Sequence, residues 1–291
     1  MRRIAACLAA TAMLVWPTMV VDAEVVTRSA AAKIPAYPKR IVSINPCADA
    51  LLMQLADKRQ IASVSHYSHD KRATSIPLTQ ALQFPATSGT AEEILAMRPD
   101  LVVAGSVVPR PTAGALKRLG IPLVQLSIPQ SVAESQQQIS QLAGIVGAKQ
   151  RGINVNQRIS TAFSKAKPAD DKKIPALIWR GGLVPGDGTL PDELLHRTGF
   201  ENVSSTYGLS RWDVLPLEHL VARPPQLLFS NALEANAGRR DRMLSHPVMK
   251  KLSHRIMIAD YPARLLHCAG PTLIDAVATL SAARRKLKAG L

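Results

Sequence analysis

Apolar residues in this chain follow two alternating patterns. Short apolar runs, such as residues 41–44, 61–64 and 101–104, are typical of buried strands. The segments between them carry apolar residues three or four positions apart, which is the spacing of an amphipathic helix. Strands that alternate with helices in this way predict an α/β fold with parallel sheets and helices on both faces.

One combination of these patterns occurs twice, at residues 92–103 and again at residues 218–229. Each copy opens with an acidic residue (Glu92 or Glu218), continues through an apolar half-turn, breaks at a proline and ends in a short apolar run. This pattern predicts a short helix with an anionic first turn, stopped by proline, that leads into a buried strand. Because each copy lies near the middle of its half of the chain, we predict two α/β lobes of similar plan with a ligand between them.

A long helical region separates the two halves. Ser131 and Glu134 form a capping-box pattern at its start, and a mostly polar stretch with a thin apolar stripe follows. We predict a linker helix over residues 148–168, between an N-terminal lobe of residues 39–147 and a C-terminal lobe of residues 172–291. The predicted fold is therefore α/β, with two Rossmann-like lobes joined by a single long helix and a ligand cleft between them. An ordinary surface helix within one domain is the alternative interpretation.

The beginning of the chain has a different character. A charged start, an apolar stretch over residues 4–15 and small residues before Glu24 are typical of a secretory signal peptide. A membrane anchor is a weaker interpretation, because Pro17 interrupts the apolar run. We predict that residues 1–23 are a signal peptide cleaved after Ala23, and that the mature protein lies in the periplasm.

The chain is strongly basic, with 36 Lys and Arg against 21 Asp and Glu and a formal net charge of +15. Such a balance indicates nucleic acid, an anionic membrane surface or anionic small ligands as partners. Export argues against nucleic acid, and the positive residues are scattered along the sequence. The charge therefore favours an anionic small ligand.

Two of the three cysteines, Cys47 and Cys268, lie outside the signal peptide. An oxidising compartment permits a disulfide between them, but their separation in sequence does not show whether they meet. We favour two unpaired, partly buried thiols. A bridge between opposite lobes would restrict opening of the cleft.

Residues 40–46, 91–103 and 194–203, together with the second repeat, resemble the periplasmic binding proteins of ABC importers for iron chelates and cobalamin. The resemblance implies a ligand cleft between two rigid lobes and a soluble monomer without a resident cofactor. It also implies one exposed glutamate per lobe that pairs with arginines of the membrane permease. These glutamates correspond to Glu92 and Glu218, which could otherwise simply stabilise a helix dipole by about 0.3–1 kcal/mol each.

From this resemblance we predict a protein that captures a metal chelate, either a corrinoid or a ferric siderophore, and delivers it to an inner-membrane permease and its ATPase. Tyr67 and Trp212 occupy the positions of pocket aromatics in the cobalamin-binding members, and aromatic faces suit large flat chelates. Arg180 and Arg211 could bind anionic groups of the ligand, whereas Trp179 could equally belong to the core. The predicted ligand-binding residues are Tyr67, Trp212, His66, Arg180, Arg211, Trp179 and His267.

Histidines offer an alternative. His66, His69 and His267 could together bind bare zinc or manganese, or one of them could provide an axial ligand to cobalt or to haem iron. The zinc and manganese relatives carry a histidine after the first strand, where this chain has Asn45 and Pro46. Bare-metal binding is therefore the minor alternative, and haem is a third candidate ligand.

Motifs of catalysis are sparse. The glycine-rich stretch 180–188 matches neither phosphate-binding fingerprint, and we predict a loop on the ligand side. No serine lies in a nucleophile-elbow motif, and Cys47 has no identifiable partner base. A binding protein is favoured over the rival class, an exported α/β hydrolase.

Overall fold

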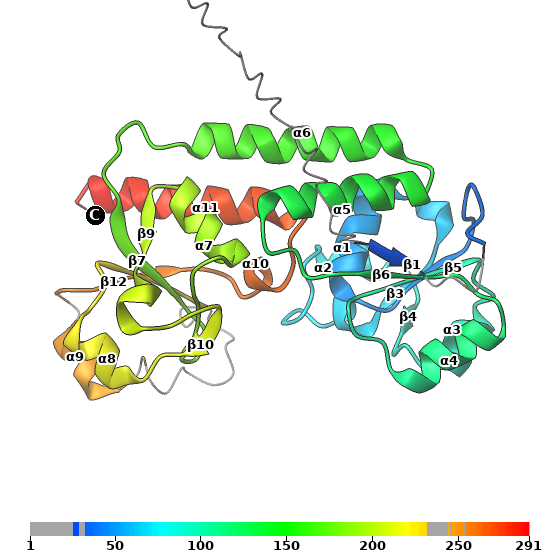
Figure 1. The fold of residues 1–291 in the computed structure, drawn as a ribbon, viewed down its shortest axis with the longest axis horizontal. Coiled ribbons are helices and arrows are strands. Elements are labelled where there is room, and N and C mark those ends of the chain that lie inside the picture. The colour runs from blue at the N-terminus through cyan, green and yellow to red at the C-terminus, as the bar shows by residue number, and fades with distance from the viewer. Residues whose placement is uncertain (1–25, 29–32, 232–243, 245, 253, 291) are drawn as a thin grey trace, which may run out of the picture.

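The structure is a computed structural model that describes residues 26–28, 33–231, 244, 246–252 and 254–290. Two α/β lobes lie side by side beneath a layer of long helices (Figure 1). This arrangement confirms the predicted fold class. The predicted signal peptide lies outside the described residues. Among the described helices, none is both long and apolar enough to cross a membrane.

The N-terminal lobe is built on a six-stranded sheet with the order β1-β6-β5-β2-β3-β4. All neighbouring strands are parallel except β1, which pairs with β6 in the antiparallel direction. The strands are β1 (Val26–Arg28), β2 (Ile41–Ser43), β3 (Ile61–Ser65), β4 (Ala86–Thr87), β5 (Leu101–Ala104) and β6 (Leu123–Leu126). The helices are α1 (Pro46–Leu55), α2 (Leu78–Ala81), α3 (Ala91–Ala96), α4 (Arg110–Arg118) and α5 (Val132–Ile145), with short 3₁₀ turns at Lys58–Gln60 and His66–His69.

The C-terminal lobe has a smaller parallel sheet with the order β12-β11-β7-β9, and a separate antiparallel ribbon of two strands. The sheet strands are β7 (Ile174–Trp179), β9 (Phe200–Asn202), β11 (Leu227–Ser230) and β12 (Met257–Asp260), and the ribbon strands are β8 (Leu183–Pro185) and β10 (Trp212–Val214). The helices are α7 (Leu190–Arg197), α8 (Leu217–Ala222), α9 (Pro247–Lys251), α10 (Arg264–His267) and α11 (Thr272–Lys288), with a 3₁₀ turn at Val203–Tyr207. The glycine-rich stretch 180–188 is thus not only a loop, because β8 lies within it.

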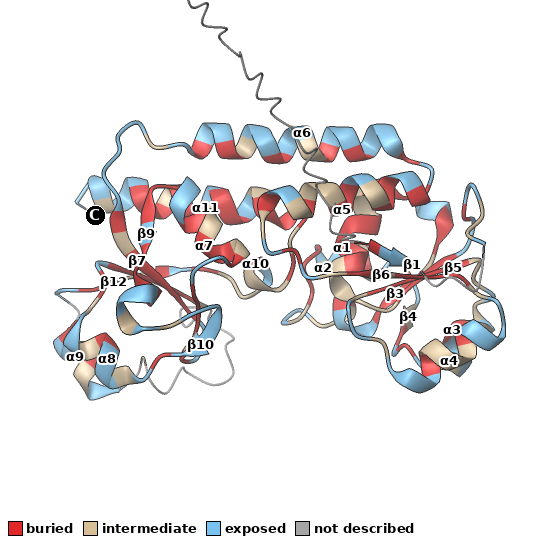
Figure 2. Ribbon diagram, in the orientation of Figure 1, coloured by how far each residue is buried: buried red, intermediate tan, exposed pale blue. Residues whose placement is uncertain are grey.

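The long helix α6 (Lys149–Ala166) runs across the molecule and packs on α5 and α11. Val155, Ile159 and Phe163 are buried on its inner side, and its outer side is exposed (Figure 2). Ile153, another apolar residue of α6, is half exposed. A narrow apolar stripe is enough to pack α6 onto the protein, because only one side of this helix contacts other helices.

Both copies of the sequence repeat form the predicted unit. In the N-terminal lobe α3 leads into β5, and in the C-terminal lobe α8 leads into β11. Every residue of β5 and of β11 is buried, as expected for central strands covered on both faces. The repeat therefore corresponds to equivalent elements of two similar lobes.

Candidate ligand site between the two lobes

The carboxyl ends of β2, β5 and β6 meet at one edge of the N-terminal sheet, and their loops form one wall of a pocket. Asn45 follows β2 and caps α1, since its Oδ1 accepts hydrogen bonds from the backbone N–H groups of Cys47 (2.9 Å) and Ala48 (3.2 Å). Its amide lies against Gly105, where an added Cβ would come within 2.5 Å of Asn45 Nδ2. Ligands of open α/β sheets bind at such strand ends.

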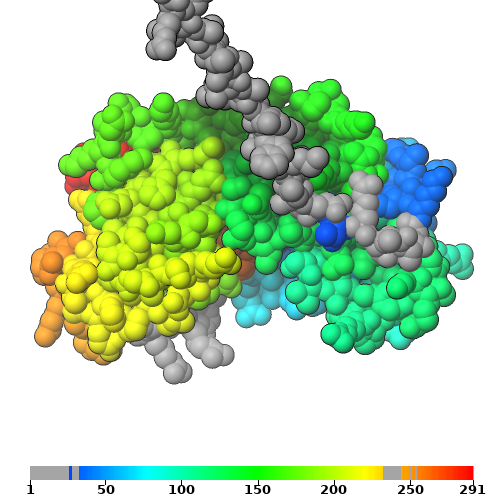
Figure 3. Space-filling model, viewed as in Figure 1, coloured from blue at the N-terminus to red at the C-terminus, as the bar shows by residue number. Residues whose placement is uncertain are grey.

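The opposite wall comes from the C-terminal lobe. Leu190 and Leu194 of α7, Trp212 of β10 and residues 265–269 face the strand-end loops across a cavity of about 230 Å³. A notch separates the two lobes on the side away from α6 (Figure 3). Among the described residues that line the cavity there is no Asp, Glu, Lys or Arg. Its walls are therefore apolar or neutral, apart from the ionisable ring of His267.

The surroundings of His267, at the end of α10, favour the neutral form of its ring. Burial lowers the pKa of this histidine, and the positive charge of Arg180 lowers it further. A neutral imidazole keeps a nitrogen lone pair that can bind a metal centre.

Trp212 belongs to the ribbon of the C-terminal lobe. Trp212 pairs with Pro185 across the β8–β10 ribbon and is 38% exposed. Gly186 allows this ribbon to form, because an added Cβ would lie 2.5 Å from the carbonyl oxygen of Arg211. Trp212 thus lines the cavity between the lobes, and its role in ligand binding stays a prediction.

Tyr67 and His66 lie outside the lining of this cavity, in the loop that follows β3. Tyr67 is 51% exposed, and its ring centroid lies 4.0 Å from that of His66. His66 Nδ1 is 3.2 Å from the carbonyl oxygen of Thr87. Because β3 is the neighbour of β2 in the sheet, this aromatic pair stands at the same sheet edge as Asn45, beyond the inner cavity.

A buried carboxyl group, which the sequence analysis missed, anchors the Tyr67 loop. Asp49 Oδ2 accepts hydrogen bonds from the Ser65 backbone N–H (3.0 Å) and from the Ser68 hydroxyl (2.6 Å). Burial raises the pKa of Asp49 to about 7, against the opposing effect of these hydrogen bonds. An aspartate inside an otherwise apolar helical segment was the available signal.

Three of the predicted site residues, Trp179, Arg180 and Arg211, do not line the cavity. Trp179 is fully buried in the core of the C-terminal lobe, beside Leu177 and Val184, so its assignment to the cleft is wrong. Arg180 and Arg211 are exposed on the C-terminal lobe and do not line the cavity. The core position of Trp179 follows from its place at the end of the central strand β7, which is covered on both faces.

The histidines do not assemble into a metal site. His69 Nε2 lies 3.1 Å from the carbonyl oxygens of both Ala81 and Phe84. Within the described part of the chain, no group of three or more His, Cys, Asp or Glu side chains could hold a metal ion. The structure thus gives no support to a bare zinc or manganese site built from His66, His69 and His267.

Cys47 and Cys268 form a disulfide, with their Cα atoms 5.2 Å apart. The prediction of two unpaired thiols is wrong. The first turn of α1 and the segment before α11 meet at the seam between the lobes, although 221 residues separate the two cysteines in sequence. Local sequence patterns contain no information about such a contact.

The two glutamates of the sequence repeat are both exposed, each as the second residue of its helix. Helices α3 and α8 lie on the side of their lobes away from α6 (Figure 1). Neither Glu92 nor Glu218 makes an ion pair with another described residue. By contrast, Glu93 accepts hydrogen bonds from the Thr87 hydroxyl and the Ser88 N–H, which lower its pKa.

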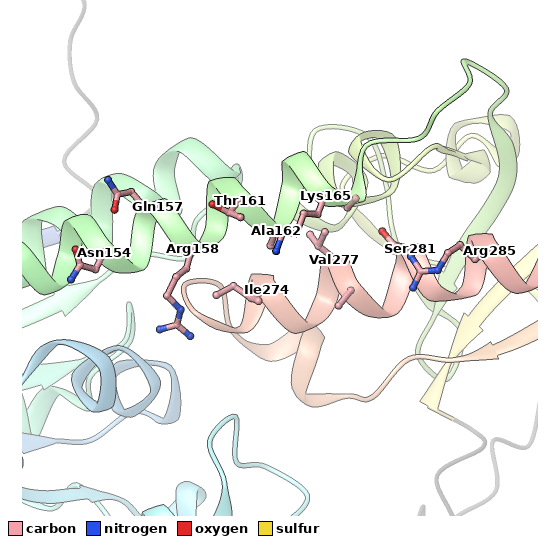
Figure 4. A pocket seen from close by; sticks show the side chains of 12 residues that line it. Asn154, Gln157, Arg158, Thr161, Ala162, Lys165, Ile274, Val277, Ser281 and Arg285 are labelled. Atoms are coloured by element: carbon pink, nitrogen blue, oxygen red, sulfur yellow. The ribbon is translucent and has the colours of Figure 1, made fainter.

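A larger hollow of about 650 Å³ lies between α6 and α11 (Figure 4). Its walls come from two helices of the outer layer and include Ala162, Ile274 and Val277, with Arg158, Lys165 and Arg285 at its margins. It does not reach the strand ends of either sheet. The smaller cavity is the better candidate for the ligand site, because both lobes and the carboxyl ends of parallel strands contribute to it.

Comparison with known proteins agrees with this architecture. The family model for periplasmic binding proteins matches residues 41–253. The chain belongs to the periplasmic binding protein family. Proteins of this family bind solutes and are not enzymes, which excludes the α/β-hydrolase alternative.

Among curated relatives, the cobalamin-binding protein of Halobacterium salinarum is 25% identical over 221 residues. The match covers 72% of this chain and 57% of the relative, so the chain spans little more than half the length of that protein.

Solved structures of periplasmic binding proteins share the fold. The periplasmic haem-binding protein of Pseudomonas aeruginosa has a TM-score of 0.64 and 24% identity, over 84% of this chain and 92% of that one. The vitamin B12-binding protein BtuF of Vibrio cholerae has a TM-score of 0.62 and 19% identity, over 87% and 99% of the two chains.

Proposed function

We propose that this protein is the exported solute-binding component of an ABC importer and that it captures a metal chelate in the cleft between its lobes. The supporting observation is the interlobe cavity, which combines strand-end loops of one lobe with Trp212 and His267 of the other. Polar contacts in such a site orient a ligand whose area is buried mainly against apolar walls. The chelate is cargo for transport rather than a resident cofactor.

Within this class, a metal bound in a large ring, a corrinoid or haem, is the first candidate. Neutral cavity walls suit the broad apolar faces of such a ring. The neutral His267 could provide a lone pair to its metal, and Tyr67 and Trp212 present exposed aromatic surface from opposite lobes. The similarity to curated cobalamin-binding proteins supports the corrinoid over haem.

A ferric siderophore is the second candidate, favoured by charge. The chain carries a net charge of +15, and Arg180 and Arg211 are exposed on the C-terminal lobe. Their planar guanidinium groups would pair with carboxylate or catecholate oxygens of an anionic chelate.

We further propose that Glu92 and Glu218 contact arginines of the permease when the loaded protein docks as a monomer in the periplasm. Three observations support this role: both glutamates are exposed, neither makes an ion pair with a described residue, and they occupy equivalent positions in the two lobes. Cleavage of a signal peptide after Ala23 belongs to the same proposal.

A thermal-shift panel tests the ligand class. The purified protein is mixed separately with each of six compounds: cobalamin, cobinamide, haemin, a ferric hydroxamate, a ferric catecholate and zinc. Ligand at about 100 times its dissociation constant adds about 2.7 kcal/mol to stability, which moves the melting temperature by an observable amount. We expect a shift with cobalamin or haemin; a shift with zinc alone, or with none of the compounds, would contradict the proposal.

Two tyrosines with similar exposure provide a matched pair for the same assay. Tyr67 is 51% exposed near the cleft, and Tyr37 is 49% exposed beside Gly147, before the strand that leads to the site. Tyr67→Ala should weaken binding of the successful chelate by at least about 10-fold, which corresponds to 1.4 kcal/mol. Tyr37→Ala should leave binding unchanged.

A further inference from the structure

A second covalent connection joins the lobes, in addition to the chain that passes through α6. Cys47 lies in the first turn of α1 in the N-terminal lobe. Cys268 lies in the segment of residues 264–271, which connects β12 of the C-terminal sheet to α11. Their disulfide therefore crosses the seam between the lobes, on the side of the molecule where the ligand cavity lies. We call residues 264–271 the seam segment.

Polar contacts with the N-terminal lobe surround the disulfide. The Ser75 hydroxyl lies 3.2 Å from Cys268 Sγ and 3.4 Å from the carbonyl oxygen of Arg264. The Gly270 N–H donates a hydrogen bond of 2.8 Å to Ser135 Oγ in α5. Three parts of the N-terminal lobe (α1, α5 and the loop after the Tyr67 turn) thus hold the seam segment.

Close packing accompanies these contacts. At Gly270, which has a φ of +71°, an added Cβ would come within 2.8 Å of Leu51 Cδ2 in α1. A side chain at this position would require the buried Leu51 side chain or the seam segment to shift, and the positive φ is itself unfavourable for residues other than glycine. Glycine therefore allows the seam segment to lie directly on the helix that carries Cys47.

The same seam segment forms part of the ligand cavity. Residues 265–269 and both cysteines line it, and the carbonyl oxygen of His267 lies 3.2 Å from Cys47 Sγ. The position of the His267 ring is consequently defined by a segment that is attached to both lobes. If the attachment to α1 were lost, the C-terminal lobe alone would place this part of the wall.

We propose that the Cys47–Cys268 disulfide is a positioning element of the ligand site, which fastens the seam segment to the N-terminal lobe and so sets the separation of the two cavity walls. The role of the cavity as the ligand site rests on the proposed function; the fastening of the seam segment does not. A disulfide that only constrains the unfolded chain would stabilise the protein without any local effect at the cavity.

Hydrogen exchange on the ligand-free protein separates these two roles. The variant carrying both Cys47→Ser and Cys268→Ser is compared with the unmodified protein, after peptide mass spectrometry without reductant has identified the cross-link. We expect amide exchange in residues 264–271 to accelerate at least about 10-fold more than exchange in the central strands β5 and β11, whose exchange follows the global loss of stability. Native-state reduction of the unmodified protein with a phosphine gives the same comparison if the double variant does not fold.

A core variant away from the seam controls for general loss of stability. Leu220 is fully buried in the second core cluster of the C-terminal lobe, and Leu220→Ala is compared at a temperature where its stability matches that of the cysteine variant. If exchange in residues 264–271 rises equally in both, or if no cross-linked peptide is found, the proposal is overturned.

Binding assays with cobalamin and haemin complete the test. Affinity for whichever probe binds the unmodified protein should fall at least about 10-fold in the cysteine variant, mainly through faster dissociation. Unchanged affinity would overturn the positioning role. If neither these probes nor the two ferric siderophores of the thermal-shift panel bind the unmodified protein, the proposed function fails, while the exchange experiment still decides whether the disulfide fastens the seam segment.

Discussion

The two lobes share one plan but build their walls of the cavity differently. The N-terminal lobe offers the loops that follow its parallel strands, and Asn45, after β2, both lines the cavity and caps α1. The C-terminal lobe offers side chains, Trp212 from a two-stranded ribbon and His267 from a short helix. The N-terminal wall thus follows the ends of the sheet strands, whereas Trp212 and His267 of the C-terminal wall come from elements outside the four-stranded sheet.

The repeated helix shows the same contrast. Helix α3 begins with Thr90, whose hydroxyl accepts the Glu93 N–H, and the Glu93 carboxylate binds residues before the helix. Helix α8 begins after Pro216 without a side-chain cap. The two copies of the repeat therefore share the exposed glutamate, but only the copy in the N-terminal lobe has a side-chain cap. The following predictions, ordered by their expected effect on stability, test how far the lobes differ.

Replacement of the two tryptophans should separate core from cleft within the C-terminal lobe. Trp179→Ala leaves a large void in the buried cluster and should cost about 3–5 kcal/mol of unfolding free energy. Trp212→Ala, at a site 38% exposed, should cost less than about 1 kcal/mol and should instead weaken chelate binding. Denaturant titration and a binding assay measure the two effects. Equal loss of stability in the two variants would contradict the assignment of Trp179 to the core.

Removal of the disulfide should loosen one lobe relative to the other. Simultaneous Cys47→Ser and Cys268→Ser should lower the unfolding free energy by about 2–5 kcal/mol, because the bond closes a loop of more than 200 residues. Calorimetry should then resolve two transitions in place of one, if the bond is what couples the lobes. A single transition with an unchanged midpoint would show that non-covalent contacts at the seam are sufficient.

The buried carboxyl of the N-terminal lobe should make stability depend on pH. The pKa of Asp49 is raised from 3.8 to about 7 in the folded state. Between these values the folded protein binds a proton that the unfolded chain lacks, so this contribution is present at low pH and is lost as the pH rises towards 7. The total loss is at most about 4 kcal/mol.

Asp49→Asn isolates this contribution, because the amide is uncharged and retains an oxygen that can accept the Ser65 and Ser68 hydrogen bonds. Melting temperatures measured from roughly pH 5 to pH 8 should decline less in the variant than in the unmodified protein. Asp57→Asn, at an exposed acidic residue, is the control. A decline of equal steepness in the Asp49 and Asp57 variants would refute the buried-acid explanation.

Removal of the exposed glutamates should affect transport far more than stability. Glu92→Ala combined with Glu218→Ala should cost only about 0.3–1 kcal/mol per helix terminus, leave chelate affinity intact and abolish uptake by cells. Glu93→Ala is the matched control, since it removes hydrogen bonds to Thr87 and Ser88 but should leave uptake in place. Normal uptake by the double variant would exclude docking through these residues.

Local sequence patterns predicted much of the fold. The strands at residues 41–44, 61–64 and 101–104 agree with β2, β3 and β5 within a few residues, and α6 lies within the helix predicted over residues 148–168. Ser131 caps α5 as its capping-box pattern predicts, by accepting the Glu134 N–H at 3.0 Å. The ribbon strand β8 escaped prediction, because its pairing partner β10 lies beyond α7 and a glycine-rich run carries no strand signal of its own.

The candidate site could be predicted only in part. Trp212 and His267 line the cavity, whereas Tyr67 lies outside it and Trp179 is in the core. Asn45 and Gly105 could have been found, because each directly follows a predicted strand where open α/β sheets bind ligands. The apolar residues around Asp49 could have indicated its burial, but not its partners, because Ser65 and Ser68 come from a loop that only the folded chain brings to α1.

By itself, the sequence determined the alternation of strands and helices, the duplicated plan of the lobes and the exposure of Glu92 and Glu218, since residue spacing, prolines and caps act within one or two turns of chain. Only the tertiary structure decided that Cys47 meets Cys268 and that burial lowers the pKa of His267 at the seam between the lobes. Both outcomes depend on packing between segments far apart in the chain, and such contacts cannot be predicted from the local spacing of residues.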